Sequence, residues 1–303
     1  MPELPEVEIT ARLLDRTLRG AEIESVLAPG INALKTFDPP LSAIEGQRIL
    51  GVRRRGKQFI LDISGELALV IHLMSAGRLQ LYEKRAGPRD RTSRLLVRVR
   101  AQAADGDVSD SGSGSPGART SERELELRLR EFGSKQAAWV KLLRADELDR
   151  EDSLATLGPE AWPDPPVLED LLDASRPLHA LLRDQHVIAG IGRSWVDEIL
   201  WQARLSPFKR GADLDPEQAA ALRDAVRQTL SGAIAHYEQV VALPIPDKLP
   251  MPLRVHRHQG EPCPRCATKL EAVHFEDYVI AYCPACQTEG RVLKDRRLSR
   301  LLR

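Results

Sequence analysis

The sequence has no net charge, no long apolar run and no cysteine outside one short stretch. Its 44 lysines and arginines balance 44 aspartates and glutamates, so only a local cluster of basic residues could indicate a polyanionic partner. No apolar run is long enough to cross a bilayer, and no secretory pattern of basic, apolar and small residues is present. We therefore expect a cytoplasmic protein with no membrane partner. At 303 residues the chain can form two or three compact units.

The N-terminus is the first feature that suggests chemistry. The chain opens Met1-Pro2-Glu3, and an initiator methionine before a small residue is normally removed. Pro2 would then carry a free secondary amine beside a carboxylate. An α-amino group has a pKa of about 8, against about 10.4 for lysine, so part of it is unprotonated near neutral pH and can form a Schiff base with an aldehyde-like carbon. The alternative is an ordinary N-terminus in which two prolines come early.

Hydrophobic periodicity divides the chain into a β-rich first part and a helical second part. Apolar residues recur at helical intervals from 6 to 18, and Gly20 is suited to end that helix. Strand patterns follow at 21–27, 47–53, 58–63, 67–73 and 95–100. After a proline cluster at 158–166, helical spacing appears at 167–172, 178–182, 196–203 and 216–237. These patterns predict an α+β protein with several domains.

Residues 101–122 interrupt the β pattern. They are rich in glycine, serine and aspartate and nearly free of apolar residues, so they cannot bury enough surface to become ordered. Leucines alternate with charged residues from 124 to 129, which is typical of a half-buried strand. We therefore predict a flexible insertion between two strands.

The cysteines form two Cys-x-x-Cys pairs, Cys263 with Cys266 and Cys283 with Cys286. Each pair makes a tight turn that directs two thiolates to one point, and two such turns give the tetrahedral sulfur set that Zn²⁺ prefers. Residues 270–282 between them have the character of a β-hairpin. We expect a structural zinc ion, because four protein ligands leave no position for a reacting water. A redox dithiol pair and an iron–sulfur site are the alternatives.

Basic residues cluster around this cysteine module. Arginines and histidines occupy much of 254–258, Arg265 lies in the first turn, and 291–303 contains further lysine and arginine. Such patches bind phosphates. The alternative for 291–303 is a solvated tail.

Three further groups are candidates for contacts with a phosphate or a base. The glycine turn 190–192 precedes a helix whose first N–H groups, together with Arg193, can hold a phosphate. Lys57 follows three consecutive arginines at the start of a strand. His72 and Met74 lie in a turn after a buried strand, where an exposed methionine can enter a base stack. A connecting turn, a solvated edge and a core methionine are the structural alternatives.

Together these motifs resemble the formamidopyrimidine-DNA glycosylase and endonuclease VIII (Fpg/Nei) family, and the resemblance runs nearly end to end. Residues 2–8 match the N-terminal signature of the family, and 54–57 match the strand that carries its phosphate-binding lysine. Segment 188–200 resembles the helix–two-turn–helix motif, and 260–286 resembles the zinc finger. Four motifs in the family's order make the resemblance highly specific. The ending 295–302 extends past the usual finger, as in a divergent bacterial subgroup of the family.

The resemblance implies a fold and a domain organisation. A two-layer β-sandwich with a leading helix would occupy 1–146, including the insertion at 101–122. A helix–two-turn–helix DNA-binding domain would follow at 147–250, a zinc β-hairpin at 251–290 and a basic tail at 291–303. In the family, DNA lies in the cleft between these domains.

The resemblance also implies a reaction. The family flips a damaged base out of the duplex. Pro2 would attack C1′ of the sugar and release the base, and Glu3 would act as acid and base near the ring oxygen. The resulting Schiff base allows β- and often δ-elimination, which cuts the strand. Lys57 would hold a phosphate beside the lesion.

Further DNA-binding residues follow from the same comparison of motifs. The wedge that enters the base stack would lie at 72–77, with His72 beside it and Met74 or Ser75 as its tip. Arg130 and Phe132 resemble the pair that fills the gap and contacts the opposite base. Arg193 would contact a phosphate.

The chain departs from the family pattern at several positions. Arg193 stands where the family usually has a phosphate-binding asparagine, and Tyr278 stands where the finger usually has an arginine, five residues before its third cysteine. The wedge segment is one residue out of register. The loop that usually covers oxidised guanine is not recognisable at 236–252. Because of these differences, the sequence does not establish that the chain makes the family's phosphate contacts, nor which lesion it recognises.

We therefore predict a bifunctional DNA glycosylase and abasic-site lyase of base excision repair. Its partner would be double-stranded DNA with a damaged base or an abasic site, and it would act as a monomer at the nucleoid of a bacterial cytoplasm. One alternative is a damaged-DNA-binding relative without catalysis or with altered specificity. Another is a zinc-ribbon interaction module on an unrelated enzyme.

Overall fold

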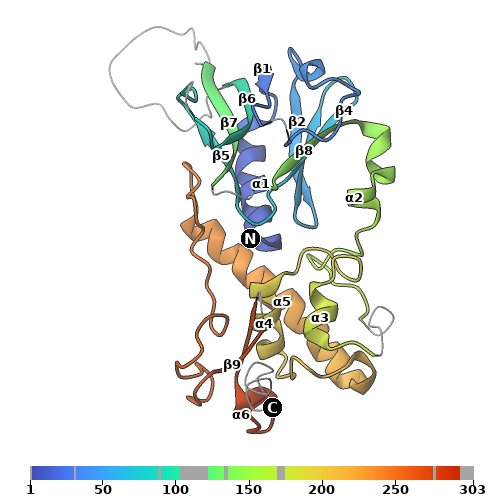
Figure 1. Ribbon diagram of the computed structural model, residues 1–303, viewed down its shortest axis with the longest axis vertical. Coiled ribbons are helices and arrows are strands. Elements are labelled where there is room, and N and C mark those ends of the chain that lie inside the picture. Colours follow the sequence, from blue (N-terminus) through green and yellow to red (C-terminus); the bar gives the residue numbers. More distant parts are fainter. Residues whose placement is uncertain are drawn as a thin grey trace, which may run out of the picture. The chain divides into compact units, whose positions relative to one another are not determined.

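The computed structural model forms two compact units (Figure 1). It describes residues 2–30, 32–87, 90–102, 122–132, 136–168, 175–275 and 278–293. The first unit comprises Met1–Pro2, Glu6–Ala155 and Val240–Leu249, and the second comprises Glu3–Pro5, Thr156–Gln239 and Pro250–Arg303. These two units are defined by which residues pack together. The division into four segments expected from the sequence stays a prediction.

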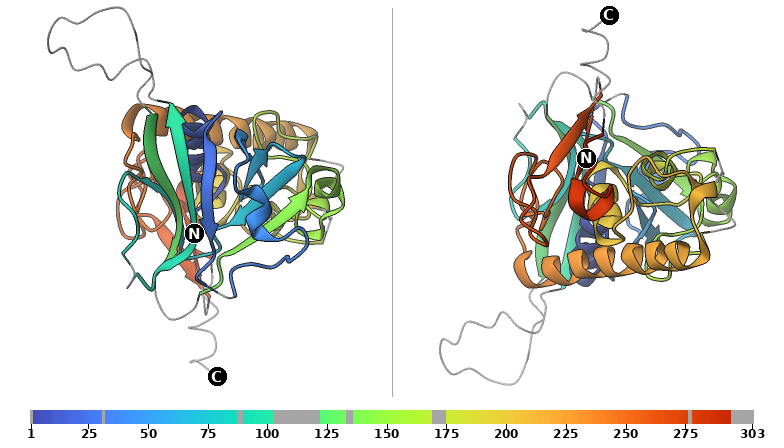
Figure 2. Two further views of the ribbon diagram at one scale, coloured as in Figure 1. Left: turned by 90° about the horizontal axis from the view of Figure 1, so that it is seen from above. Right: turned by 90° about the horizontal axis from the view of Figure 1, so that it is seen from below.

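The first unit contains two four-stranded antiparallel sheets. One has the order β1 (Glu22–Leu27), β6 (Ser93–Gln102), β7 (Glu122–Glu131) and β5 (Gly77–Tyr82). The other has the order β2 (Ile49–Arg55), β3 (Gln58–Ile63), β4 (Leu67–His72) and β8 (Trp139–Arg144). Short helical segments lie at Leu41–Ile44, Ala145–Arg150 and Asp152–Ala155 (α2). Figures 1 and 2 show the two sheets on either side of helix α1 (Leu4–Leu18).

One aliphatic core joins α1 to both sheets. Val7, Leu14 and Leu18 are fully buried on one face of α1 and pack with alternate residues of the strands. The helix ends before Gly20, whose φ of +82° favours glycine. The predicted leading helix and the predicted strands up to 73 are therefore confirmed, with small shifts of their ends.

Strands β5 and β8 escape prediction from the sequence. β5 buries Gln80, a polar residue, whose amide donates to the carbonyl of Ile245 at 3.1 Å and to Asp247 at 2.8 Å. Such a partner, far away in the sequence, makes burial of Gln80 possible. The strand also alternates Leu79 and Leu81, both buried, with polar residues, which is a signal that could have found it. β8 was missed although Val140 and Leu142, which alternate with Lys141, are both buried.

Strands β6 and β7 pair along their whole length, from Ser93 opposite Arg130 to Gln102 opposite Glu122. The predicted insertion at 101–122 thus connects two paired strands, as expected, and most of it lies outside the described residues. Two other predicted segments also fall largely outside them, namely the helix at 167–172 and the basic tail at 291–303.

The second unit is helical and ends in a small β-hairpin. Its helices are α3 (Leu178–Arg183), α4 (Arg193–Gln202) and α5 (Pro216–Val240), with a short 3₁₀ helix at Gly211–Asp213. α5, the long helix along one side of this unit in Figure 2, begins where the carboxylate of Asp215 accepts the N–H of Gln218 at 2.8 Å. The hairpin of β9 (Glu271–His274) and β10 (Val279–Tyr282) leads into α6 (Pro284–Gln287). The predicted hairpin between the cysteine pairs is confirmed.

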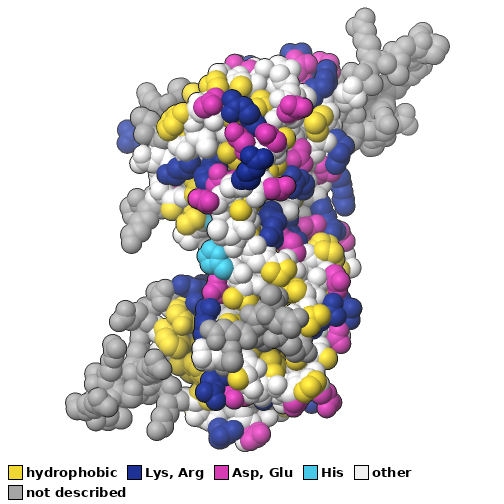
Figure 3. All heavy atoms as spheres, turned by 90° about the vertical axis from the view of Figure 1, so that its right-hand side faces the viewer, with side chains coloured by type: hydrophobic (Ala, Val, Ile, Leu, Met, Phe, Trp, Pro, Cys, Tyr) yellow, Lys and Arg dark blue, Asp and Glu magenta, His cyan; other side chains and the backbone are white. Residues whose placement is uncertain are grey.

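The exposed surface reflects the balanced composition. On the face of the first unit drawn in Figure 3, Lys and Arg side chains are interspersed with Asp and Glu side chains. Within the described ranges, no helix has both the length and the apolar character that crossing a membrane requires.

Candidate functional site

Helix α4 holds the side chain of Glu3 at its N-terminus. The carboxylate oxygens of Glu3 accept hydrogen bonds from the backbone N–H groups of Ser194, at 2.9 Å, and Trp195, at 3.3 Å. The first N–H groups of a helix have no intrahelical partner and attract negative charge. Glu3 is 2% exposed, and its neighbour Pro2 is half-buried. The residue predicted as acid and base is therefore fixed in place by backbone donors.

The glycine turn before α4 makes room for this N-terminal segment. The N–H of Leu4 donates to the carbonyl of Gly190 at 3.0 Å. A Cβ atom on Gly190 would lie 2.9 Å from the Cβ of Leu4, and one on Gly192 would lie 2.6 Å from a carboxylate oxygen of Glu3. Both positions therefore require glycine. The first N–H groups of α4, expected from the sequence to hold a phosphate, instead bind the chain's own carboxylate.

The predicted phosphate ligand Lys57 lies beside His72. Lys57 follows β2 and is 8% exposed, and its neighbour Gln58 pairs with His72 across β3 and β4. Burial and the charge of Lys57 lower the pKa of His72 to about 4, so this ring is neutral near pH 7. Its Nδ1 accepts the N–H of Met74 at 3.0 Å, which leaves the proton of the neutral ring on Nε2. An ammonium group and an imidazole N–H donor thus lie close together in this unit.

The arginines before Lys57 are held by carboxylates. Arg53 pairs with Asp62 at 2.7 Å across β2 and β3. Arg54, whose side chain is 6% exposed, pairs with Glu8 of α1 at 2.8 Å. These contacts favour a structural role for both arginines.

Arg130 and Phe132, predicted as a pair, do lie together. The guanidinium of Arg130 lies 4.7 Å from the ring centre of Phe132. It also donates to the hydroxyl of Tyr82 at 2.8 Å and to that of Thr92 at 3.1 Å. The Phe132 side chain is 43% exposed. The orientation of the Arg130 guanidinium is therefore fixed by hydrogen bonds, while the exposed ring of Phe132 is accessible to a ligand.

Met74, the wedge candidate, lies at the same end of the first sheet as Phe132. Its φ of +50° is unusual for a side chain other than glycine, and it is half-buried, whereas Ser75 is exposed. The turn ends at Gly77, which pairs with Glu131 across β5 and β7. This pairing places the tip of the turn near the end of β7, from which Phe132 projects.

The four predicted metal ligands converge. Their Sγ atoms all lie within 4.8 Å of one another. The Sγ of Cys266 lies 3.5 Å from those of Cys283 and Cys286, and the Sγ of Cys263 lies 4.0 Å from that of Cys286. Hydrogen bonds from Thr268 lower the pKa of Cys266 to about 6. The cluster could therefore hold a metal ion.

Helix α4 also supports the cysteine module. The indole N–H of Trp201 donates to the Sγ of Cys263 at 3.4 Å, and Arg265 donates to the carbonyl of Trp201 at 2.9 Å while its guanidinium lies 4.2 Å from the ring centre. Such outer contacts orient metal ligands.

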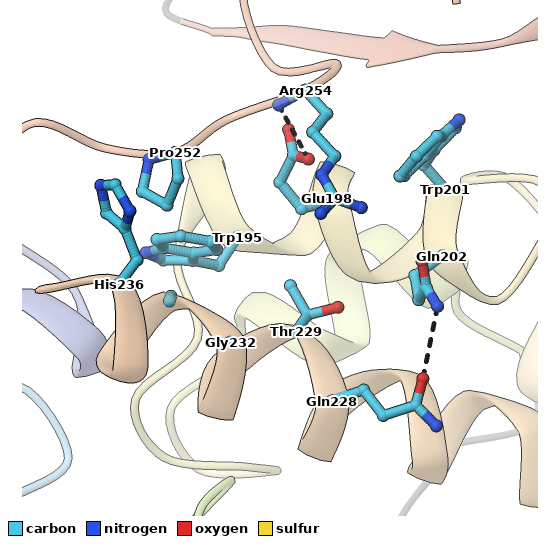
Figure 4. Close-up of a pocket in the computed structure, with 11 residues that line it drawn as sticks. Trp195, Glu198, Trp201, Gln202, Gln228, Thr229, Gly232, His236, Pro252 and Arg254 are labelled. Carbon is cyan, nitrogen blue, oxygen red and sulfur yellow. Dashed lines mark hydrogen bonds between the residues drawn. The ribbon is translucent and has the colours of Figure 1, made fainter. Parts of the chain in front are cut away.

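Glu198 fixes the segment that leads into the module. Its carboxylate accepts the backbone N–H groups of Arg254 at 3.1 Å and of Val255 and His256 at 2.9 Å. Burial raises the pKa of Glu198. Figure 4 shows this side chain reaching from α4 to the backbone of Arg254.

Asp197 connects three segments of the second unit. Its carboxylate lies 2.7 Å from the Nδ1 of His256 and accepts the N–H of Ala281 in β10 at 3.1 Å. The Nε2 of His179 in α3 lies 3.3 Å from its other oxygen, close enough for attraction but without the alignment of a hydrogen bond. Sequence reasoning missed Asp197 and Glu198, although two adjacent acidic residues within the apolar helix are a signal that could have found them.

A cavity of about 360 Å³ lies between α4, α5 and the segment 252–254. Trp195 and Glu198 line it from α4, and the amide of Gln202 donates to that of Gln228 in α5 at 3.3 Å (Figure 4). None of the predicted site residues lines this cavity. Its walls are the residues that hold the helices and the module together, and we assign it no part in the reaction.

The two departures from the expected motifs lie in contact. The guanidinium of Arg193, at the start of α4, lies 5.1 Å from the ring centre of Tyr278, which precedes β10. The guanidinium of Arg183 lies 4.4 Å from the same ring. Neither contact was predicted, because the residues come from separate segments.

Comparison with known families matches two long segments of the chain. Residues 1–110 match the formamidopyrimidine-DNA glycosylase N-terminal domain, and residues 158–243 match the formamidopyrimidine-DNA glycosylase H2TH domain. Together these segments cover more than half of the 303 residues.

Curated relatives match over nearly the full length. The formamidopyrimidine-DNA glycosylase of Chloroflexus aurantiacus is 32% identical, over 95% of this chain and 98% of the relative. That of Thermus thermophilus is 31% identical, over 96% of this chain and 100% of the relative. An uncharacterised formamidopyrimidine-DNA glycosylase-like protein of Mycobacterium tuberculosis is 40% identical, but over only 42% of this chain and 80% of the relative.

Solved structures show the same fold. The Lactococcus lactis enzyme in complex with DNA that contains N7-benzyl-Fapy-dG superimposes with a TM-score of 0.76 at 24% identity, covering 95% of this chain and 100% of that chain. Its complex with abasic-site DNA also gives 0.76 at 24% identity, covering 94% and 99%. The predicted fold class is confirmed: N-terminal sheets with a leading helix, a helical region and a C-terminal four-cysteine cluster with a β-hairpin.

Proposed function

The chain belongs to the formamidopyrimidine-DNA glycosylase and endonuclease VIII family, and from that premise we propose how its own residues carry out the family's reaction. It is a DNA glycosylase of base excision repair that acts on double-stranded DNA with a damaged base or an abasic site. The observation that carries the assignment of residues is the position of Glu3. Glu3 follows Pro2 directly in the sequence, and its buried carboxylate is held by two backbone N–H groups of α4.

Pro2 is the nucleophile once Met1 has been removed. Its nitrogen forms a bond to C1′ as the glycosidic bond breaks, and the leaving base takes a proton from water. The Glu3 carboxylate takes the N–H proton from the proline nitrogen and gives it to the ring oxygen as the sugar opens, which leaves an iminium between the proline nitrogen and C1′. Loss of a proton from C2′ then expels the 3′ phosphate, and a second elimination expels the 5′ phosphate. The fixed carboxylate lowers the entropic cost of these proton transfers.

The remaining predicted residues bind DNA. Lys57 and the Nε2–H of His72 contact a phosphate beside the lesion, since both are donors in one part of the first unit. Met74 enters the base stack, and Phe132 fills the gap with Arg130 against the opposite base. The exposed ring of Phe132 and the Arg130 guanidinium that lies against it support this assignment.

The four-cysteine cluster holds a structural zinc ion. Zinc–sulfur bonds of about 2.3 Å in a tetrahedron separate the sulfur atoms by about 3.8 Å, and the observed separations of 3.5 and 4.0 Å fit this value. The ion would stabilise the fold of the hairpin and supply no reacting group. We further propose that the protein acts as a monomer in the bacterial cytoplasm, in association with the nucleoid.

Borohydride trapping on an abasic duplex tests the proposal. We expect the wild-type protein, trimmed of Met1, to form a covalent adduct that survives denaturation. Pro2→Gly and Glu3→Gln should lower the trapping rate by at least about a hundredfold. Glu217→Gln is the matched control, because Glu217 lies in the first turn of α5 and is exposed.

Two outcomes would contradict the proposal. If mass spectrometry shows that Met1 is fully retained and trapping still occurs, Pro2 is not the nucleophile, since its nitrogen would be an amide. If the protein binds damaged duplexes tightly but never forms an adduct, it is a damaged-DNA-binding relative without catalysis.

A further inference from the structure

Tyr278 lies in a group of aromatic and basic side chains that come from three separate segments. Its ring stacks with that of Phe275, with centres 4.5 Å apart and planes at 6°, and more loosely with that of His179, at 6.0 Å and 7°. The guanidinium groups of Arg183, at the end of α3, and Arg193, at the start of α4, lie 4.4 and 5.1 Å from its ring centre. Both distances are within the range of a cation–π contact.

This arrangement concentrates positive charge on one ring. Arg193 is exposed, and Tyr278 and Arg183 are half-buried. The Nη1 of Arg183 is buried and has no hydrogen-bond partner within the described residues. His179 adds no charge near neutral pH, because burial lowers its pKa. Two guanidinium groups that lie against the same ring are suited to a ligand with several anionic oxygens.

The group is also held rigidly. Arg193 is the first residue of a helix whose next two N–H groups bind Glu3. Tyr278 precedes Val279, which pairs with His274 across the hairpin. A binding group fixed before the ligand arrives loses little entropy on binding.

We propose that Arg183, Arg193 and Tyr278 form one platform that binds the sugar–phosphate backbone of duplex DNA. This inference rests on the proposed function and deepens it. The tyrosine ring positions both guanidinium groups, and these donate to phosphate oxygens. The hairpin has Tyr278 where the family usually has an arginine, and Arg183 of α3 and Arg193 of α4 supply the basic groups instead. The two departures from the family pattern, at 193 and 278, therefore compensate for each other. Because phosphates carry no sequence information, the platform adds affinity for damaged and undamaged duplexes alike.

Fluorescence anisotropy with two short duplexes tests the platform in the full-length, zinc-loaded protein. One duplex carries a tetrahydrofuran abasic analogue and the other is undamaged, and Kd is measured from 50 to 300 mM KCl. Arg193→Gln and Arg183→Gln should each weaken both complexes by about tenfold. Each should also reduce the slope of log Kd against log salt by about 0.9. Arg227→Gln is the matched control, because Arg227 is an exposed arginine of α5 that pairs with Asp224.

The tyrosine variants test the coupling. Tyr278→Phe keeps the ring and should bind almost as wild type. Tyr278→Ala should weaken both complexes, although no charge is removed, and the double variant with Arg193→Gln should lose less than the product of the two single losses. Zinc content and the thermal midpoint show that the hairpin remains folded. Unchanged affinity in Tyr278→Ala, or losses that simply multiply, would overturn the platform.

The outcome separates this inference from the proposed function. If the wild-type protein traps abasic DNA but the arginine variants bind like wild type, only the platform is wrong. If the variants lose affinity as expected but the wild-type protein never forms an adduct, the platform stands and the catalytic proposal fails.

Discussion

The core of the first unit and the junction around α4 are built in different ways. In the first unit, aliphatic side chains of α1 and of both sheets share one core, and β2, β3 and β4 follow one another through short turns. Around α4, backbone and side-chain hydrogen bonds join residues that are far apart in the sequence. Glu3, His256 and Ala281 all meet this one helix.

Because they are built differently, the two regions should respond differently to substitution. An aliphatic core tolerates exchanges of similar volume, because burial of apolar area is non-directional. A buried polar junction depends on each donor and acceptor, because an unpaired buried group costs about 1–3 kcal/mol. The Glu3 carboxylate, on which the proposed chemistry depends, belongs to the second kind of region. We therefore expect damage at the junction to spread to the site, while the sheets remain intact.

Removal of the proposed zinc ion should give the largest effect. Chelation, or Cys266→Ser, should release the segment 255–290, because structural zinc contributes about 10–16 kcal/mol of apparent binding energy in small modules. Hydrogen exchange of β9 and β10 should then approach the rate of an unfolded chain, while β3 and β4 keep their protection. Return of zinc to the chelated protein should restore protection. Protection of β9 and β10 that survives complete metal loss would show that packing on α4 suffices.

Loss of Asp197 should give the next largest effect. Asp197→Ala leaves His256 and the N–H of Ala281 without their acceptor in a buried place. We expect a cost of about 3–5 kcal/mol to the second unit, measured as faster hydrogen exchange in α4 and β10 under increasing urea. Asp224→Ala, an exposed carboxylate on α5, is the control and should cost less than about 0.5 kcal/mol. Equal loss of protection in β3 and β4 would contradict the division between the two regions.

Features that arise from local sequence patterns could be predicted from the sequence, whereas contacts between distant segments could not. The leading helix and six of the strands, β1 to β4, β6 and β7, follow from local patterns of apolar residues. The cysteine cluster follows from spacing, because two Cys-x-x-Cys turns have few other uses. The contact of Arg193 with Tyr278 could not be predicted, because the two residues come from separate segments. The glycine turn was recognised, but its ligand, Glu3, lies almost 190 residues away.

The smallest effect concerns pH and belongs to the first unit. The pKa of His72 is about 4 in the folded protein, against 6.5 in an unfolded chain, so only the unfolded chain takes up this proton between these values. Stability should therefore fall as the pH drops from 6.5 to 4, by about 1.4 kcal/mol per pH unit and about 3 kcal/mol in all. His72→Gln should remove this part of the pH dependence in urea unfolding followed on β3 and β4, whereas His186→Gln, an exposed histidine of the second unit, should leave it in place. If the two variants lose stability in parallel over this range, the neutral, buried state of His72 is refuted, and with it the Nε2–H donor that we place beside Lys57.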